Sequence, residues 1–327
     1  MRLIHNTSQD PAFNLALEEY LLTGTDTELI MLWRNGPSVI IGNNQNAVEE
    51  IDADYVRANN IDVVRRMSGG GAVFHDLGNI NYTIINNGRA GDFGGYAAFT
   101  APVRGYLRRI GINAEFSGRN DLVIDGRKFS GNAQAAKNGR IMHHGCILFD
   151  ADFNDLARSL KPKAEKIESK GIKSVRSRVT NVASHLPVPM TAQEFLDGLG
   201  AYFRANVEGI TEYELSPQDI AAARSLADSK YSSWEWNFGR SPNYNWSNSN
   251  RFDFGFVDVR LSVKHGVIES AAFFGDFFGV LDKSALEDVF AGIRHDRQSV
   301  LQALEGFDIG LYIHGMEHGH ITELLCP

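Results

Sequence analysis

The chain has 327 residues, which is enough for one large domain or for two domains of unequal size. Its hydrophobic fraction of 43% is typical of a soluble globular protein, and its net charge of −8 argues against nucleic acid as a partner. No run of about 18 apolar residues is present, so we expect no membrane span and no signal peptide. Cys146 and Cys326 form neither a disulfide framework nor a zinc pattern, and we expect a cytoplasmic setting.

The first part of the chain predicts helices and short strands. Asp10 and Pro11 are typical of an N-cap and a first helical residue, and the helix is expected to run through Leu22. Another helix is expected from a Thr100 cap to Ile110. Short apolar runs predict strands at 29–33, 39–41, 61–66, 72–74 and 80–85.

The middle of the chain contains two tight-turn signals. Asp125-Gly126 separates residues 122–124 from 128–130, and Asn138-Gly139 precedes an apolar run at 141–149. Hairpins pair their strands antiparallel, which argues against a doubly wound parallel sheet. We therefore expect an α+β fold, with mixed or mainly antiparallel sheets and helices packed against them.

The composition changes between residues 232 and 250. This stretch is rich in Trp, Asn, Ser and Gly and has little periodicity, so it predicts the end of a first domain covering residues 1–245. The residues that follow predict two or three strands and a helix. We expect them to form a small α+β domain over residues 250–327.

The most informative stretch is the glycine run at residues 65–76, which reads RRMSGGGAVFHD. Glycines let successive backbone N–H groups form an anion-binding nest, and a neighbouring guanidinium can bind a phosphate through two hydrogen bonds. Neither the Walker pattern nor the dinucleotide fingerprint is present. The stretch predicts a site for a phosphate, or for a carboxylate that is being activated.

Seven blocks of sequence, taken together and in order, resemble the lipoate–protein ligases of the long two-domain bacterial form. The blocks are residues 65–76, 77–82, 117–122, 126–133, 143–145, 170–181 and 232–239. The resemblance implies the fold shared with biotin ligases and octanoyltransferases. It also implies that lipoate and ATP give lipoyl-AMP and pyrophosphate, and that the lipoyl group then passes to a lysine of an acceptor protein. The acceptors it implies are the glycine cleavage H protein and the E2 lipoyl domains of 2-oxo acid dehydrogenases.

Lys128 has two interpretations. By its position alone, it is an exposed lysine beside a hairpin turn, in a strand where Lys128, Ser130 and Asn132 share one face. The resemblance instead places it at the catalytic lysine of the family, where it contacts both ATP and lipoate. An ammonium there would draw the lipoate carboxylate towards the α-phosphate and stabilise the negative charge of the transition state.

The resemblance also implies which residues surround this lysine. It assigns ATP and adenylate binding to Arg66, Gly71, Ala72, Val73 and Phe74, and lipoate binding to Gly70 and His75. Adjacent strand residues point in opposite directions, so Arg65 is either a site residue or a structural one.

Two further assignments concern charge. Asp121 is the best acidic candidate for Mg²⁺, because a hard cation that bridges phosphates needs a carboxylate. The basic segment 161–178 matches the adenylate loop of the family, which would close over lipoyl-AMP and exclude water. The residues assigned to this loop are Lys170, Gly171, Ser174, Val175 and Arg176.

Two alternatives use the same fold. An ATP-independent octanoyl or lipoyl transferase needs a cysteine in the pocket. Cys146 alternates with His144 and Leu148 and is predicted to be a small core residue, and Cys326 is next to last in the chain. The other alternative is a non-catalytic lipoate-binding protein. A monomer is the default expectation.

Overall fold

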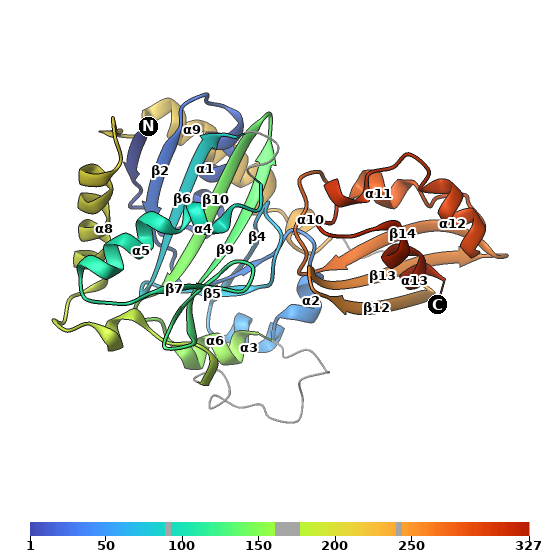
Figure 1. Cartoon of the computed structure of the whole chain (residues 1–327), viewed down its shortest axis with the longest axis horizontal. Helices are drawn as coiled ribbons and strands as arrows, with labels where there is room; N and C mark the ends of the chain where they lie inside the picture. Colours follow the sequence, from blue (N-terminus) through green and yellow to red (C-terminus); the bar gives the residue numbers. More distant parts are fainter. Residues whose placement is uncertain (89–92, 161–176, 240–243, 327) are drawn as a thin grey trace.

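The computed structural model describes residues 1–88, 93–160, 177–239 and 244–326 (Figure 1). Within these ranges the strands form an eight-stranded mixed sheet, a three-stranded mixed sheet and a three-stranded antiparallel sheet. Helices pack on all three sheets. The α+β prediction, with mixed and mainly antiparallel sheets, is confirmed.

The large sheet has the order β11-β1-β2-β6-β10-β9-β8-β7. β1 pairs parallel with β2 and β11, and the other neighbours pair antiparallel. Its strands are β1 (Arg2–His5), β2 (Leu29–Trp33), β6 (Asn79–Asn87), β7 (Glu115–Ser117), β8 (Asp121–Ile124), β9 (Arg127–Lys137), β10 (Arg140–Leu148) and β11 (Thr211–Glu212).

The second sheet has the order β4-β3-β5 and carries the glycine run between two of its strands. β4 precedes the run and β5 follows it. The strands are β3 (Ser38–Ile41), β4 (Asp62–Arg65) and β5 (Val73–His75).

Helices cover both faces of the large sheet (Figure 1). Up to residue 239, the helices among the described residues include α1 (Pro11–Thr23), α2 (Ala47–Glu50), α3 (Ala53–Ala58), α4 (Tyr96–Phe99), α5 (Ala101–Arg109), α6 (Phe153–Ser159), α8 (Ala192–Asn206), α9 (Pro217–Leu226) and α10 (Trp234–Asn237). This part also contains a 3-10 turn, η3 (Val182–His185), and a π-helical turn, η4 (Ala227–Tyr231). Side chains of α5 and α8 share a core with one face of the large sheet, whereas α1, α9 and η4 pack on the other face.

α1 is buried on nearly all sides because it lies between the large sheet and the second sheet. Its apolar residues share one core with strands of both sheets, including Met31 of β2 and Ile40 of β3. The helix therefore also buries three polar side chains, Asn14, Glu18 and Glu19, each of which has hydrogen-bond partners. The predicted N-cap is confirmed, since the Asp10 carboxylate accepts from the backbone N–H groups of the first turn.

Both predicted hairpin turns are confirmed. Asp125 and Gly126 have φ angles of 50° and 73°, and Asn138 and Gly139 have 53° and 72°. Positive φ at both central residues matches the right-handed twist of the strands they connect. Thr100 precedes α5 as predicted, but its side chain does not cap the helix, because α4 runs directly into α5 and the Thr100 hydroxyl donates to a carbonyl of α4.

The strand of Lys128 contains a β-bulge that reverses its expected faces. Leu122 pairs with Ser130, but the next residue, Val123, pairs with Lys128, so Phe129 is an extra residue on β9. Lys128 therefore extends over Gly131, where its Nζ is 3.1 Å from the position of a Cβ added to that glycine. The prediction that Lys128 shares a face with Ser130 is wrong, because Phe129 takes up the additional place in the core.

The third sheet follows residue 243 and has the order β12-β13-β14. Its strands are β12 (Trp246–Phe252), β13 (Gly255–Lys264) and β14 (Val267–Gly275), and α11 (Ser284–Asp288), α12 (Arg297–Ala303), η5 (Ile309–Leu311) and α13 (His318–Leu325) complete this part. It has its own apolar core, and the segment after β14 contacts the glycine run. In the ranges that the structure describes, no helix is both long and apolar enough to cross a membrane.

Gly145 provides a test of this packing. A Cβ at this position in β10 would lie 2.3 Å from Asn132 Oδ1 and 2.6 Å from the Tyr82 ring, inside a fully packed region. We expect Gly145→Ala to lower the free energy of unfolding by about 1–3 kcal/mol, as overpacked cores do. Urea unfolding checks the value. Gly319→Ala, at an exposed glycine with nothing within 4 Å, is the matched control and should not destabilise the chain. Equal stability of the two variants would contradict the packing described here.

Candidate active site

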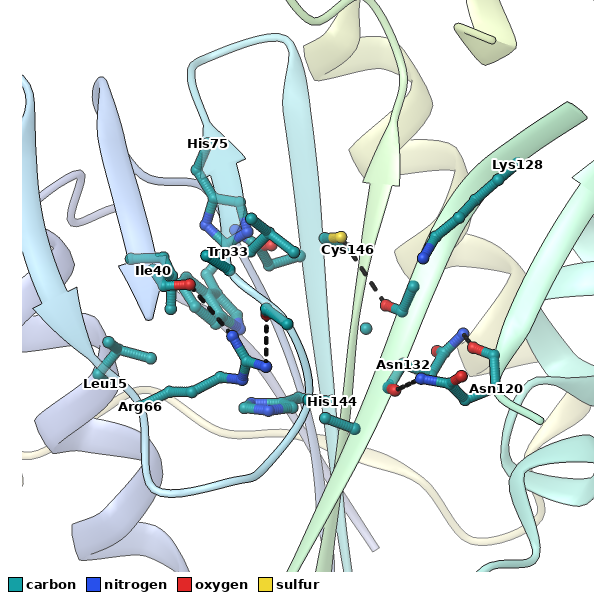
Figure 2. A pocket seen from close by; sticks show the side chains of 18 residues that line it. Leu15, Trp33, Ile40, Arg66, His75, Asn120, Lys128, Asn132, His144 and Cys146 are labelled. Atoms are coloured by element: carbon teal, nitrogen blue, oxygen red, sulfur yellow. Dashed lines mark hydrogen bonds between the residues drawn. The ribbon is translucent and has the colours of Figure 1, made fainter. Parts of the chain in front are cut away.

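A pocket opens between the large sheet and the glycine run, and it brings together most of the predicted site residues. In Figure 2, Arg66 and His75 lie on one side, Lys128, Asn120 and Asn132 on the other, and Cys146 between them. The predicted residues that line it are Arg66, Gly70, Gly71, Ala72, Val73, His75 and Lys128. The side chain of Phe74 instead points away, into the core of the second sheet with α2 and α3.

A row of residues crosses four strands of the large sheet and forms the floor of the pocket. Trp33 pairs with Asn81, Asn81 with Cys146, and Cys146 with Gly131. Residues directly opposite each other in antiparallel strands share a face. All four line the pocket, so its floor changes from an aromatic ring at one end to the glycine beneath Lys128 at the other.

Lys128 is held at the pocket by its charge and by its backbone. Its Nζ lies 2.8 Å from the Asp121 carboxylate, and the side chain is 41% exposed, so another anion can reach it. Its carbonyl accepts a hydrogen bond from the Thr180 N–H at 2.9 Å. This bond joins the strand of Lys128 to the segment that directly follows the predicted adenylate loop.

Arg66 holds the glycine run in shape. Its buried guanidinium donates four hydrogen bonds, to Ser68 Oγ and to the carbonyls of Ile40, Gly69 and Gly71, over 2.6–3.1 Å. Burial lowers its pKa to about 10, which leaves it charged at neutral pH. Gly70 completes the loop with φ +92°, a conformation that glycine adopts at little cost.

A buried hydrogen-bond chain connects Arg66 to α1. Arg66 donates to Ser68 Oγ, which lies 2.6 Å from Nε2 of His144, and Nδ1 of His144 lies 3.0 Å from both carboxylate oxygens of Glu18. The carboxylate favours the ring proton on Nδ1, so Nε2 accepts from the Ser68 hydroxyl. Glu18 also accepts from the Thr83 hydroxyl. The glycine run is thereby fixed to the large sheet and to α1.

Arg65 has a structural role. Its buried guanidinium donates to the carbonyls of two separate segments, 42–45 and 236–237. The guanidinium joins these segments to each other instead of pointing into the pocket. This settles the alternative that the sequence left open for Arg65.

His75 presents a hydrogen-bond donor to the pocket. The Asn35 amide donates to Nδ1, since the Asn35 oxygen already accepts from Asn14, and the ring proton of His75 is therefore on Nε2. Burial, followed by the charge of Arg66, lowers the pKa of His75 to about 3, so the ring is neutral. Among the described residues Nε2 has no hydrogen-bond partner.

Asn81 presents a second donor. Its Oδ1 accepts from the Asn79 amide at 3.0 Å, which turns Nδ2 away from that neighbour. The residue is 2% exposed, and its Nδ2 finds no hydrogen-bond partner in the described parts of the chain. A buried donor without a partner costs roughly 1–3 kcal/mol, so a ligand oxygen that satisfies it gains that much.

Not all of the candidate residues lie at the pocket. His144 lines the pocket, but His143 faces the opposite side of the sheet, where it stacks on Phe99. Asp121 lies beside Lys128, and the described residues contain no group of three or more potential metal ligands. The residues assigned to the adenylate loop, Lys170, Gly171, Ser174, Val175 and Arg176, lie outside the described residues.

Residues of the site that sequence reasoning did not assign include Glu18, Trp33, Ser68, Asn81 and Cys146. The alternation of Cys146 with His144 was recognised, but the face they share borders the pocket, so the prediction of a core residue is wrong. A polar Asn81 inside an apolar strand was the available signal. Nothing in the sequence around Glu18 and Trp33 indicates that they lie near the glycine run.

The C-terminal part closes one side of the glycine run. The Phe277 carbonyl accepts a hydrogen bond from the Gly70 N–H at 3.4 Å. Gly69 lies so close to the same carbonyl that a Cβ added to Gly69 would be 2.3 Å from the carbonyl oxygen. The guanidinium of Arg119 lies 4.5 Å from the centre of the Phe278 ring. The absence of side chains at these glycines therefore also allows the C-terminal part to pack closely against the glycine run.

The sequence matches two family descriptions. The "Lipoyl protein ligase A/B catalytic domain" matches residues 10–204, and the "Bacterial lipoate protein ligase C-terminus" matches residues 241–325. The chain belongs to the lipoate–protein ligases. It is 45% identical to lipoate–protein ligase LplJ of Bacillus subtilis over 96% of this chain and 95% of that protein. It is 39% identical to lipoate–protein ligase 1 of Staphylococcus aureus over 99% of this chain and 100% of that protein.

Two solved structures of lipoate–protein ligases agree with this membership, and a third structure shares the fold. A lipoate–protein ligase A bound with ATP is 29% identical, with a TM-score of 0.64 over 73% of this chain and 98% of that chain. The bipartite ligase of Thermoplasma acidophilum, described with its E2 lipoyl domain, is 32% identical, with a TM-score of 0.67 over 74% and 97%. Plasmodium falciparum LipL1, at 23% identity and a TM-score of 0.79 over 99% and 97%, shows the same fold over nearly the whole chain.

The buried histidines of this ligase predict how its stability depends on pH. Burial lowers the pKa of His75 and His143 to about 3, whereas an unfolded histidine titrates near 6.5. Between these values the unfolded chain binds protons that the folded chain does not, so stability falls as the pH decreases below 6.5. His143→Gln should remove about 2 kcal/mol of the stability difference between pH 7.5 and 5.0, measured by urea unfolding.

The matched control is His265→Asn, at an exposed turn where asparagine tolerates the positive φ of 50°. It should keep the pH dependence of the wild type. An unchanged pH dependence in His143→Gln would show that His143 takes up a proton in the folded protein.

Proposed function

We propose that this chain activates lipoate with ATP, forms lipoyl-AMP and pyrophosphate, and transfers the lipoyl group to a lysine of an acceptor protein. The observation that carries the proposal is the placement of Lys128 opposite a glycine run that Arg66 holds in shape. This arrangement puts a cation at one wall of a pocket and a backbone anion nest at the other. A carboxylate and a phosphate can therefore meet between them.

Lys128 acts on the carboxylate. The Lys128 ammonium is partly exposed and is paired with Asp121. The lipoate carboxylate replaces Asp121 as its partner. A carboxylate oxygen then attacks the α-phosphorus of ATP, an O–P bond forms, and the bond to pyrophosphate breaks. The ammonium stabilises the charge on the transition state and on the mixed anhydride.

The glycine run binds the nucleotide. Gly71 has open space where a Cβ would be, so a phosphate can approach its backbone closely. Backbone groups of Gly71, Ala72, Val73 and Phe74 hold the ATP and the adenylate, and the charge of Arg66 favours an anion there. The side chain of Phe74 anchors the loop from the opposite side.

Lipoate fits the remainder of the pocket. Leu15, Trp33 and Ile40 give it an apolar wall for the aliphatic chain. His75 Nε2–H and Asn81 Nδ2–H provide donors for oxygens of the substrate, and Gly70 lets the glycine run approach it. A pocket that combines an apolar wall with a few buried donors matches a fatty carboxylic acid.

Mg²⁺ would enter with the phosphates. Magnesium in such sites takes one or two carboxylates and completes its coordination with phosphate oxygens and water. Asp121 fits this role, because its carboxylate adjoins the pocket and is released when the substrate takes its place on Lys128. A bridging cation would neutralise charge on the leaving pyrophosphate.

Lys170, Gly171, Ser174, Val175 and Arg176 belong to the proposed adenylate loop. The Thr180 N–H, four residues after Arg176, bonds to the carbonyl of Lys128, and Val179 forms a β-bridge with Lys128. The end of the loop is thus anchored at the reacting centre. Closure there would exclude the water that hydrolyses the mixed anhydride.

The proposed acceptors are the glycine cleavage H protein and E2 lipoyl domains. The T. acidophilum ligase is described with its E2 lipoyl domain, which supports this class of partner. In this proposal residues 1–245 carry adenylation and transfer, residues 250–327 form an accessory domain, and the chain acts as a monomer.

Pyrophosphate release tests the proposal. Wild-type protein mixed with ATP, Mg²⁺ and lipoate should release pyrophosphate in a lipoate-dependent manner before any acceptor is added. Lys128→Ala should lower the rate by roughly 10²–10³-fold, the loss typical of removing one electrostatic stabiliser of a transition state. Lys137→Ala, on the same strand and half-exposed, is the matched control and should keep the wild-type rate. Lipoate binding without pyrophosphate release by the wild type would instead identify a binding protein.

A further inference from the structure

The thiol of Cys146 occupies the same end of the pocket as the proposed catalytic lysine. Cys146 faces Gly131 across the β10–β9 pair, and its Sγ lies 3.7 Å from the Gly131 carbonyl. The amine of Lys128 extends over the same glycine, 3.1 Å from the position of its absent Cβ. Cys146 is half-buried and lines the pocket, so it is accessible to a molecule bound there (Figure 2).

A donor without a partner lies beside this thiol. Asn81 is the cross-strand neighbour of Cys146 on β6, and its Nδ2 has no hydrogen-bond partner among the described residues. The amide and the thiol therefore share one face of two adjacent strands. An N–H group next to a nucleophile is the arrangement that stabilises the oxyanion of an acyl-transfer reaction.

We propose that Cys146 accepts the acyl group of lipoyl-AMP and forms a thioester on the enzyme itself. The sulfur bonds to the acyl carbon, the bond from that carbon to the phosphate oxygen breaks, and AMP leaves with the thiol proton on its phosphate. Asn81 Nδ2–H receives the negative charge that develops on the carbonyl oxygen. The inference rests on the proposed function, because it needs the acyl-adenylate as its substrate.

The thioester retains the acyl group when no acceptor is bound. An acceptor lysine can attack it in the same way as the adenylate: the amide bond forms, the C–S bond breaks, and the sulfur takes a proton from the attacking amine. Thioesters hydrolyse more slowly than acyl phosphates, so Cys146 protects the activated acyl group from water. Direct attack of the acceptor on the adenylate remains available alongside this route.

The experiment measures acyl groups that stay on the protein after acid denaturation. Full-length protein is incubated with ATP, Mg²⁺ and radiolabelled octanoate or lipoate, without acceptor, and pyrophosphate release is recorded in the same sample. Acid denaturation releases the non-covalent adenylate, whereas a thioester survives and is cleaved by neutral hydroxylamine. We expect hydroxylamine-sensitive label that peptide mapping assigns to Cys146. Cys146→Ala should carry at least tenfold less of this label than the wild type. Cys326→Ala, at the distant cysteine, should carry as much label as the wild type.

Three outcomes would overturn the inference. Pyrophosphate release with no retained label in the wild type would leave the ligase function intact and exclude a thioester. Label that resists hydroxylamine and maps to Lys128 would assign the acyl group to an amide. Absence of lipoate-dependent pyrophosphate release would overturn the proposed function as well, so the two claims are tested separately.

Discussion

The buried guanidinium of Arg66 is the constraint on which the site depends. An unpaired buried charge costs several kcal/mol, and this one is stable because the glycine run folds back to give it two carbonyls, with Ser68 and Ile40 supplying the rest. The same hydrogen bonds fix the backbone of the nest, so the arginine and the loop stabilise each other. Through Ser68 and His144 the arrangement continues to Glu18, which connects a phosphate-type loop to the core helix.

Because α1 lies between two sheets, its residues support both sides of the pocket. One side of α1 brings Glu18 to His144 of the large sheet, and its apolar residues also support Ile40 of the second sheet. The pocket is lined by residues of both sheets, with the glycine run of the second sheet on one side and Lys128 of the large sheet on the other. Asp121 positions Lys128, whereas the glycine run positions Arg66, so the two cations are held independently. A substrate bound between them would contact both sides of the pocket.

Local signals in the sequence predicted local structure well. The Asp10 cap and the Asp125-Gly126 turn follow from side-chain and backbone preferences of a few neighbouring residues, and the structure confirms both. The face of Lys128 could not be predicted in the same way, because the bulge on β9 puts the Phe129 side chain into a core built from residues far away in the sequence. Cys146 shows the same limit: alternation gave its face, but only the tertiary fold determines whether that face borders core or pocket. The resemblance to the ligases identified the family, whereas Ser68, Asn81 and Glu18 needed the structure.

The most direct test of this account is a crystal structure with a non-hydrolysable sulfamoyl analogue of lipoyl-AMP. The account predicts that the sulfamoyl group lies against the backbone of residues 70–73, and that the acyl oxygen lies within hydrogen-bond distance of Lys128 Nζ, with Asp121 displaced from that amine. It also predicts that Arg66 keeps its bonds to the glycine run. An analogue bound away from the glycine run, with Lys128 still paired to Asp121, would contradict the central claim that this pocket joins a carboxylate to a phosphate.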